Sequence, residues 1–354
     1  MPAPDYLRDR FPLLAEQLPT LHLASLPTPV RELALGTDSG RRFVSVKYDN
    51  LTGDVYGGNK VRKLEYVFPR ARTRHALRVA TFGAVGSNHA LATALYARKA
   101  GFDCTCFLSH QACTPLVAAT LNMHAQNGTE LIRYGGSYKT RIEILRRDLW
   151  GRHSWVIPMG GSSWLGTIGF VAAGLELADQ VANHEIPLPD KLYVGTGTMG
   201  TAVGIALGLS IAGLATEVHA VRVSDASITN WKKMRLLLNK TVAMMHRLDK
   251  AVPEDLGARA NLRIRDEFFG PGYAQGTSAT EKAIRLARDQ LRLTLEPTYT
   301  GKALAALLAD MRLPENEALN LLYWHTYNSV PLNVPNDHPL DATALPKEFL
   351  RYFP

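Results

Sequence analysis

Residues 56–65 have the sequence YGGNKVRKLE and place Lys60 behind two glycines and an asparagine. A ligand can approach the backbone closely at Gly57 and Gly58, because glycine has no Cβ. A lysine amine that is desolvated in such a place becomes a nucleophile towards carbonyl compounds. The simpler alternative is a helix-capping turn followed by a basic surface at Arg62 and Lys63. The motif by itself leaves both interpretations open.

The bulk composition is that of a soluble enzyme. The chain has 354 residues, enough for two domains or one large α/β unit, and 46% of them are hydrophobic. The first ten residues carry charges on both sides of Tyr6 and have no apolar signal core. The only cysteines are Cys104, Cys106 and Cys113, which lack a second pair to complete a metal site. We therefore expect reduced thiols, no bound metal, a cytoplasmic location and no membrane partner.

The net charge of +8 raises the question of nucleic-acid binding. The densest basic stretch, residues 70–78, contains four arginines and one histidine. A nucleic-acid reader would combine such a face with stacking aromatic residues or a known docking motif, and this sequence has neither. The charge is better explained by a solvated helix face with weak steering of anionic substrates, so we expect no nucleic-acid partner.

The middle of the sequence alternates short apolar runs with helical segments. Strands separated by helices of this length are typical of parallel sheets covered by helices, in which ligands collect at the carboxyl ends of strands. We expect irregular chain up to about residue 40 and again over residues 333–354. The expected strands cover residues 43–48, 78–83, 104–108, 130–134, 155–159, 192–194 and 217–223, with helices over 88–99 and 165–182.

Three loops between these elements are rich in Gly, Ser and Thr. They cover residues 86–89, 160–167 and 195–201, and each precedes a helix. The N-terminus of a helix binds anions through its free backbone N–H groups and its partial positive charge. Two such sites would suit a ligand phosphate and a substrate carboxylate.

The loop at residues 195–200 also satisfies the pattern G-x-G-x-x-G, which suggests a nicotinamide dinucleotide as an alternative ligand. That fingerprint needs an acidic residue at the end of the next strand. Arg222 and Ser224 occupy that place here, and Asp225 comes late in the sequence for this role. The loop also lies past the middle of the chain. Its three threonine hydroxyls favour one compact phosphate group over a dinucleotide.

With these motifs the chain resembles the fold-type II pyridoxal-phosphate enzymes. More specifically, it is similar to the family that contains D-cysteine desulfhydrase and 1-aminocyclopropane-1-carboxylate (ACC) deaminase. Seven motifs carry the resemblance, in an order and spacing that fit together over most of the chain. They are residues 57–65, 87–89, 160–166, 195–201, 270–273, 299–302 and 325–326.

The resemblance implies how the chain would hold pyridoxal 5'-phosphate. Lys60 would form a Schiff base with it, Asn88 would hydrogen-bond its phenolic oxygen, and Thr326 would face its ring. The cofactor phosphate would lie in the glycine- and threonine-rich loop. The members of that loop are Gly195, Thr196, Gly197, Thr198, Met199, Gly200 and Thr201.

The resemblance also implies where the substrate amino acid would bind. Ser87 and His89, with nearby backbone N–H groups, would receive its carboxylate. Tyr273 and Tyr299 would flank its side chain as acid, base or hydroxyl partners, and Lys60 would move protons at its α-carbon. The catalytic residues implied are Lys60, Ser87, Tyr273 and Tyr299, and Ser163 and Trp164 join Ser87 and His89 as substrate-binding residues.

One contrast within this family bears on the substrate. The deaminase branch has a glutamate after the second tyrosine, whereas this chain has Thr300 after Tyr299 and Thr326 in the later motif, as the desulfhydrase branch does. A neutral hydroxyl pairs with an unprotonated pyridine ring, which makes the cofactor a weaker electron sink. That property suits elimination of a good leaving group such as thiolate more than the opening of a cyclopropane ring.

The sequence departs from the family pattern at three places. Gly86 replaces the usual glutamine before the Ser-Asn-His motif. Ser163 and the bulky Trp164 replace the usual asparagine and small residue, and Tyr327 with Asn328 replaces two glycines. We expect Trp164 and Tyr327 to reshape the substrate pocket.

The sequence therefore predicts an α/β enzyme of two lobes, similar to the tryptophan synthase beta subunit, with parallel sheets covered by helices. Residues 58–170 would form a small domain, and residues 1–57 with 171–354 a large cofactor-binding domain. The expected reaction is β-elimination from D-cysteine to pyruvate, ammonia and hydrogen sulfide. The alternatives are an ACC deaminase, another amino-acid lyase, or a protein that holds the cofactor without catalysis. The resemblance implies a homodimer.

Overall fold

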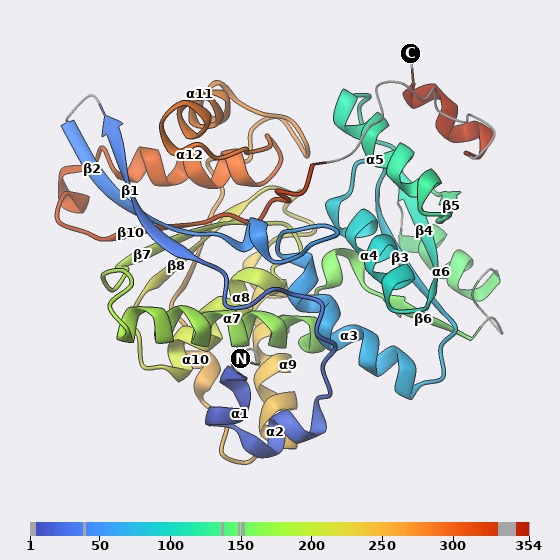
Figure 1. Cartoon of the computed structure of the whole chain (residues 1–354), viewed down its shortest axis with the longest axis horizontal. Helices are drawn as coiled ribbons and strands as arrows, with labels where there is room; N and C mark the ends of the chain where they lie inside the picture. Colours follow the sequence, from blue (N-terminus) through green and yellow to red (C-terminus); the bar gives the residue numbers. More distant parts are fainter. Residues whose placement is uncertain are drawn as a thin grey trace.

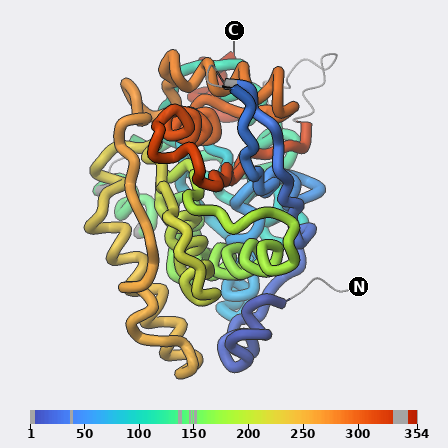
Figure 2. Tube along the Cα trace, turned by 90° about the vertical axis from the view of Figure 1, so that its left-hand side faces the viewer, coloured from blue at the N-terminus to red at the C-terminus, as the bar shows by residue number. Residues whose placement is uncertain are grey.

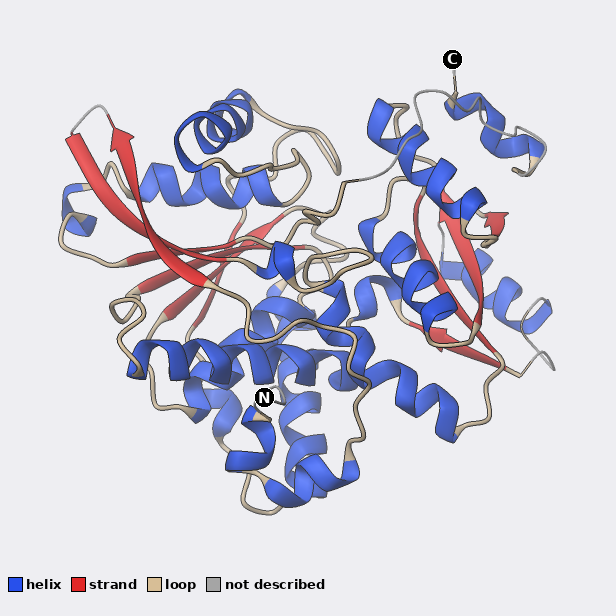
Figure 3. Ribbon diagram, in the orientation of Figure 1, coloured by secondary structure: helices blue, strands red, loops and turns tan. Residues whose placement is uncertain are grey.

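The computed structural model describes residues 5–37, 40–135, 138–147, 149, 153–331 and 345–353. Two β-sheets lie side by side, and each is covered by helices (Figure 1). Figure 3 shows the strands of both sheets enclosed between helical layers. The α/β class with parallel sheets covered by helices is confirmed.

The larger sheet has six strands in the order β1-β2-β10-β7-β8-β9. The edge strand β1 pairs antiparallel with β2, and every other pair in this sheet is parallel. The strands are β1 (Val30–Thr37), β2 (Gly40–Lys47), β7 (Lys191–Thr196), β8 (Glu217–Arg222), β9 (Leu262–Arg265) and β10 (Leu321–Trp324).

The smaller sheet has four strands in the order β5-β4-β3-β6, all of them parallel. Its central strand β3 is buried over its five middle residues, because helices cover both faces. The strands are β3 (Arg78–Ala84), β4 (Asp103–Ser109), β5 (Glu130–Arg133) and β6 (Ser154–Ile157).

Helices cover both faces of each sheet. On the larger sheet, α11 and α12 lie on one side, and α7, α8, α9 and α10 lie on the other (Figure 1). On the smaller sheet, α4 and α5 cover one side and α6 the other. The helices are α1 (Tyr6–Arg10), α2 (Pro12–Gln17), α3 (Lys60–Thr73), α4 (Asn88–Lys99), α5 (Pro115–Gln126), α6 (Tyr138–Arg147), α7 (Trp164–Ala182), α8 (Gly200–Ile211), α9 (Trp231–Leu248), α10 (Leu256–Arg259), α11 (Ser278–Leu286) and α12 (Thr300–Asp310).

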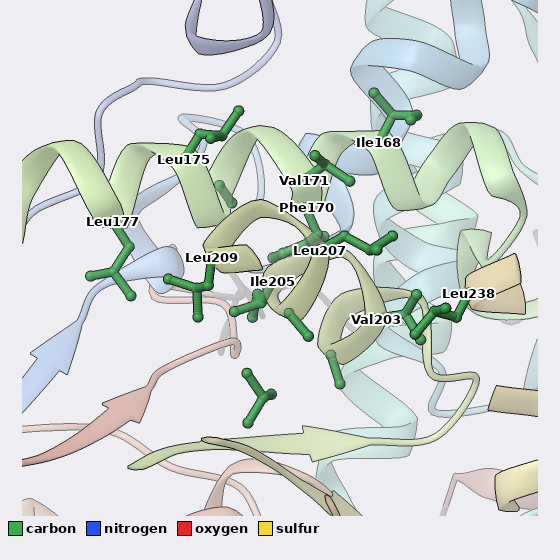
Figure 4. Close-up of a cluster of buried hydrophobic side chains, with 14 of the residues drawn as sticks. Ile168, Phe170, Val171, Leu175, Leu177, Val203, Ile205, Leu207, Leu209 and Leu238 are labelled. Carbon is green, nitrogen blue, oxygen red and sulfur yellow. The ribbon is translucent and has the colours of Figure 1, made fainter. Parts of the chain in front are cut away.

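The pair α7 and α8 forms the centre of the largest hydrophobic cluster (Figure 4). The two helices touch through glycines: a Cβ on Gly208 would lie 2.3 Å from the carbonyl oxygen of Val171, and one on Gly174 would lie 2.6 Å from that of Ile205. Helix α7 is long and apolar enough to cross a membrane, but 72% of its apolar window is buried inside the protein. Its apolar composition therefore fits a core helix.

The expected strands and the two expected helices are present within a few residues of their predicted bounds. The expectation of irregular chain up to residue 40 was wrong, since α1, α2 and β1 form there. These short elements escape sequence patterns because tertiary contacts stabilise them. The N-terminal helices pack beside the end of α9 (Figure 2). There, Leu14 N donates to Asp249 and Gln17 donates to the carbonyl of Leu248.

The C-terminal region also differs from the expectation. Residues 332–344 lie outside the described residues, and residues Lys347–Tyr352 form the 3₁₀ helix η6. Phe349 and Tyr352 are buried in the hydrophobic cluster that contains α3, α4 and β4. The end of the chain thus packs on the smaller sheet's half and not with the predicted large domain. The domain boundaries at 57/58 and 170/171 stay a prediction.

A buried ion network joins the two halves. Arg62 on α3 contacts Asp49 Oδ1 at 2.8 Å and Glu176 Oε1 on α7 at 2.9 Å. Lys47, at the end of β2, contacts the same Glu176 oxygen at 2.5 Å. All four side chains are at most 1% exposed. Burial by itself would raise the pKa of Glu176, but Arg62 and Lys47 lower it to about 2, so this carboxylate stays charged.

Replacing Arg62 with methionine should strongly destabilise the fold. The change leaves Asp49 and Glu176 buried with less compensation, and breaking such a network costs about 3–5 kcal/mol. Denaturant unfolding with a cofactor-free sample of each protein would measure this loss. Arg70→Met, on the exposed side of the same helix, is the matched control and should change stability by less than about 0.5 kcal/mol. Equal effects of the two substitutions would contradict the importance of the network.

Candidate active site

A cavity of about 250 Å³ lies between the two sheets. Its walls come from the carboxyl ends of β3, β4, β7, β8 and β10 and from the first turns of α3, α4 and α8. The cavity therefore lies where parallel α/β sheets bind their ligands. Most of the predicted site residues line it, namely Lys60, Ser87, Asn88, His89, all seven residues of the 195–201 loop, Tyr273, Tyr299 and Thr326.

Lys60 is the first residue of α3, and its Nζ lies 2.9 Å from Asn59 Oδ1 and 5.8 Å from the centre of the Tyr299 ring. Burial lowers the pKa of Lys60 from 10.5 to about 8, against the opposing attraction of the Glu296 carboxylate. A larger fraction of this amine is therefore uncharged near neutral pH than of an exposed lysine, and the uncharged form is the one that acts as a nucleophile or a base.

The two glycines before Lys60 are needed because two chain segments meet there. A Cβ on Gly57 would lie 1.9 Å from the carbonyl oxygen of Asn50. Gly58 has φ +91°, and a Cβ there would lie 2.6 Å from the carbonyl oxygen of Thr326. The same carbonyl accepts from Asn59 N at 3.2 Å. This packing brings Lys60 and Thr326 to the same cavity.

The 195–201 loop leads from β7 into α8 and has the features of an anion site. Met199 has φ +67° at the N-cap of α8. Within the described part of the chain, the backbone N–H groups of Thr198, Met199 and Thr201 donate no hydrogen bond. Asn59 Nδ2 donates to the Thr201 hydroxyl at 3.0 Å, which connects this loop to the lysine turn. Free N–H donors at a helix N-terminus are well suited to a phosphate group.

Lys63 is a cavity residue that we did not predict. It is 2% exposed, and its Nζ donates to the Gly160 carbonyl and the Ser162 hydroxyl, both at 3.1 Å. A Cβ on Gly200 would lie 3.1 Å from this nitrogen, so Lys63 reaches the start of α8. Burial, reinforced by Lys60, holds its pKa well below 10.5. Its spacing of three residues from Lys60 on one helix could have identified it.

Ser87, Asn88 and His89 begin α4 at the carboxyl end of β3. The Ser87 hydroxyl caps the helix by accepting from Ala90 N at 3.3 Å. Within the described residues, the backbone N–H groups of Asn88 and His89 have no acceptor, so this turn can receive a carboxylate.

The His89 ring itself is directed to other partners. Its Nε2 lies 2.8 Å from the Thr81 hydroxyl and its Nδ1 lies 3.5 Å from the Thr93 hydroxyl. Burial, together with Lys60 and Lys63, holds the pKa of His89 well below 6.5, so the ring is neutral. Any contribution of His89 to anion binding would therefore come from its backbone N–H group.

Tyr273 and Tyr299 lie together in the cavity wall. Their hydroxyl oxygens are 3.4 Å apart, and the rings meet edge to face. Burial raises the pKa of both phenols, which therefore stay protonated. Tyr299 stands at the N-cap of α12, where the Glu296 carboxylate accepts from its backbone N–H at 2.8 Å. Glu296 is a second cavity residue that we did not predict.

Thr300 and Thr326, the two threonines that distinguish this chain from the deaminase branch, have different surroundings. The Thr300 hydroxyl is occupied by Glu296, lying 3.0 Å from its Oε1, and Thr300 does not line the cavity. Thr326 does line it, with no side-chain hydrogen bond among the described residues. The structure therefore leaves Thr326, and not Thr300, as the neutral hydroxyl available to a ligand ring.

Two predicted substrate-binding residues do not line the cavity. Ser163 caps α7 by accepting from Gly166 N at 3.2 Å, and Trp164 packs against the hydrophobic cluster around α7 and α8. The expectation that Trp164 reshapes the pocket is thus corrected, whereas Tyr327 does lie in the cavity wall. The third departure, Gly86, makes room for the Gln111 side chain, whose amide would lie 3.1 Å from a Cβ at position 86.

His110 is a further unpredicted residue of the cavity wall. It follows β4, and its Nδ1 lies 2.6 Å from the Tyr352 hydroxyl and 2.6 Å from Arg351 Nη2, both on the C-terminal segment. These partners are more than 240 residues away in sequence. No local pattern could have indicated this contact.

The comparisons with known proteins identify the family of this chain. Residues 21–321 match the family of pyridoxal-phosphate dependent enzymes. The chain is 30% identical over 338 residues to the D-cysteine desulfhydrase of Salmonella paratyphi A, covering 91% of this chain and 98% of the relative. The chain therefore belongs to the pyridoxal-phosphate dependent enzymes, and it is a lyase of the D-cysteine desulfhydrase and ACC deaminase type.

Solved structures give the same result. An ACC deaminase homologue superposes with a TM-score of 0.70 at 28% identity, covering 92% of this chain and 94% of the other. A fungal L-serine ammonia-lyase from Rhizomucor miehei shares the fold, with a TM-score of 0.59 at 19% identity and coverage of 88% and 95%. The fold-type II architecture is confirmed, and the family decides against the dinucleotide alternative for residues 195–201.

The cavity fits pyridoxal 5'-phosphate by its own chemistry. The free backbone donors of Thr198, Met199 and Thr201, with Lys63 beside this loop, match a phosphate group. Lys60 supplies an amine with a lowered pKa for the aldehyde. When bound, this cofactor supplies an electron sink for charge that develops at the substrate α-carbon.

The pH dependence of cofactor capture should report the pKa of Lys60. The neutral amine is the reactive form, so the rate at which cofactor-free protein captures pyridoxal phosphate should rise with pH and level off above a midpoint near 8. Stopped-flow absorption would measure the rate. Borohydride reduction and peptide mapping should place the adduct on Lys60 and not on Lys63. A midpoint near 10.5, or an adduct on another lysine, would contradict this assignment.

Proposed function

We propose that this lyase catalyses β-elimination from a small amino acid that carries a leaving group on its β-carbon. The reference reaction converts D-cysteine and water to pyruvate, ammonia and hydrogen sulfide. The observation that carries the proposal is the neutral Thr326 hydroxyl in the cavity, together with a Thr300 hydroxyl that is occupied by Glu296. The relatives named D-cysteine desulfhydrase, which match nearly the full length of the chain, support the same substrate.

The residues at the start of α4, beside the smaller sheet, would bind the carboxylate of the substrate. Ser87 and the free N–H groups of Asn88 and His89 would hold its carboxylate at the start of α4. The positive end of the helix favours a negative charge at this place. This contact would orient the α-carbon of the substrate towards Lys60.

Proton transfers would fall to Lys60 and the tyrosine pair. Lys60, with its lowered pKa, would take the proton from the α-carbon. Tyr273 and Tyr299 would face the β-carbon, where one hydroxyl would donate to the departing thiolate while the other holds it by a hydrogen bond. Both phenols stay protonated at neutral pH, so they would act first as donors.

Other assignments remain candidates for the same site. An ACC deaminase is favoured by the structural likeness to the ACC deaminase homologue. Another amino-acid lyase, or a protein that holds the cofactor without catalysis, would be favoured by the departures at Gly86 and Tyr327. We also propose a homodimer, from the resemblance to the family, and a cytoplasmic location, from the three cysteines that we expect to be reduced.

A panel of amino acids would test the proposed function. Both enantiomers of cysteine, serine and 3-chloroalanine, together with ACC, would be assayed for keto acid, ammonia and sulfide. We expect the highest kcat/KM with D-cysteine, with equal amounts of pyruvate and sulfide. Preferential turnover of ACC would favour the deaminase. An inactive protein that still binds pyridoxal phosphate would favour the non-catalytic alternative.

Replacing Tyr299 with phenylalanine should remove a proton donor without emptying the site. We expect kcat/KM for the best substrate to fall by about two to four orders of magnitude, which is the usual contribution of general acid–base catalysis. The visible absorption of the bound cofactor should remain. Tyr193→Phe, which loses a buried hydroxyl bound to Asp310 outside the cavity, is the control and should keep near-normal turnover. Unchanged turnover of the Tyr299 variant would leave Tyr299 as a packing residue.

A further inference from the structure

Tyr56, directly before the glycines of the lysine turn, contacts the cavity residue Asn88. Its side chain is 2% exposed, and its hydroxyl donates to Asn88 Oδ1 at 3.1 Å. Its backbone carbonyl accepts from the Tyr96 hydroxyl at 2.8 Å, on the same helix as Asn88. Tyr56 is therefore fixed against α4 at two points, although 32 residues separate it from Asn88.

The contact decides which end of the Asn88 amide faces the cavity. Its oxygen is occupied by the Tyr56 hydroxyl, whereas its NH₂ group has no acceptor among the residues that the structure describes. Asn88 lines the cavity, so the unused group there is a donor. Burial raises the pKa of Tyr56 well above 10, so the phenol keeps its proton and continues to donate.

We propose that Tyr56 is a positioning residue that holds the Asn88 amide with its NH₂ group directed to an anionic oxygen of the ligand. In the bound cofactor this oxygen would be the phenolate. The proposal rests on the placement of Asn88 beside that oxygen in the proposed function, and it does not depend on which amino acid is the substrate.

The physical reason lies in the two nearly equivalent orientations of an amide. Turned by 180°, Asn88 would present its carbonyl oxygen to the phenolate, and the two lone-pair-bearing oxygens would repel each other. Such a turn would also leave the buried Tyr56 O–H proton without an acceptor among the described residues, since its oxygen could then only accept from the amide NH₂ group. A buried donor at position 56 thus favours one orientation, and phenylalanine at this position would remove the preference.

Tyr56→Phe in the holoenzyme tests the proposal with two measurements other than turnover. The first is the pH midpoint of the visible absorption of the bound cofactor. A donor to the phenolate stabilises the deprotonated form, so weakening it should move the midpoint to higher pH. The second is the rate of cofactor loss in the presence of a trapping protein, which should rise about threefold to tenfold, as expected for one hydrogen bond.

Tyr96→Phe is the matched control. It also removes one buried tyrosine hydroxyl, but this hydroxyl donates to the Tyr56 carbonyl and not to Asn88. We expect its absorption midpoint to stay that of the parent. A midpoint shift in Tyr96→Phe as large as that in Tyr56→Phe would overturn the proposal, because the effect would then come from packing of α4.

A double-mutant cycle with Asn88→Ala tests whether Tyr56 acts through Asn88. If it does, Tyr56→Phe should add nothing to the midpoint shift once Asn88 is alanine. Full additivity of the two shifts would overturn the inference. No shift in Asn88→Ala itself would instead disprove the placement of Asn88 beside the phenolate, while D-cysteine turnover would still test the proposed reaction separately.

Asn88→Asp keeps the inference testable if Tyr56→Phe does not fold. One carboxylate oxygen can still accept from Tyr56, and the other would then face the phenolate. We expect this variant to lose its cofactor faster than Asn88→Ala does. Cofactor retention equal to the parent would show that the amide oxygen faces the cavity, which would overturn the proposal.

Discussion

The buried contact between Arg62 and the carboxylates of Asp49 and Glu176 holds the two halves of the protein in one arrangement. Arg62 is on α3, two residues after Lys60, so this contact also fixes the turn that carries the lysine. Lys47 shares Glu176 and connects the network to the end of β2. Because such charges are costly to bury without partners, other placements of α3 against α7 are strongly disfavoured.

The cavity combines buried amines with unpaired N–H donors. Burial lowers the pKa of Lys60 and Lys63, and free N–H groups begin both α4 and α8. An anionic ligand would stabilise the charged form of a buried amine, and it would also accept hydrogen bonds from the free N–H donors. Pyridoxal phosphate, with a phosphate and a phenolate, matches this pattern, and the carboxylate of an amino acid would match the second helix terminus.

Much of the site could be predicted because its residues belong to short continuous motifs. The glycines before Lys60 indicate its role. The 195–201 loop is indicated by its glycine and threonine content and by its position before a helix. Ser163 and Trp164 lie in a matching motif as well, yet their side chains cap and pack α7 outside the cavity. A motif predicts that a loop approaches the ligand, but the direction of each side chain depends on the neighbouring elements.

The sequence by itself determined the alternation of strands and helices, the lysine turn and the glycine-rich loops, because periodicity and glycine content act over a few residues. Only the tertiary structure decided which side chains share the cavity. Lys63 meets Gly160 across 97 residues, and His110 meets Tyr352 across 242. The spacing from Lys60 indicates the side of α3 on which Lys63 lies, but these two pairings depend on how the sheets and their helices pack together, so no local pattern records them.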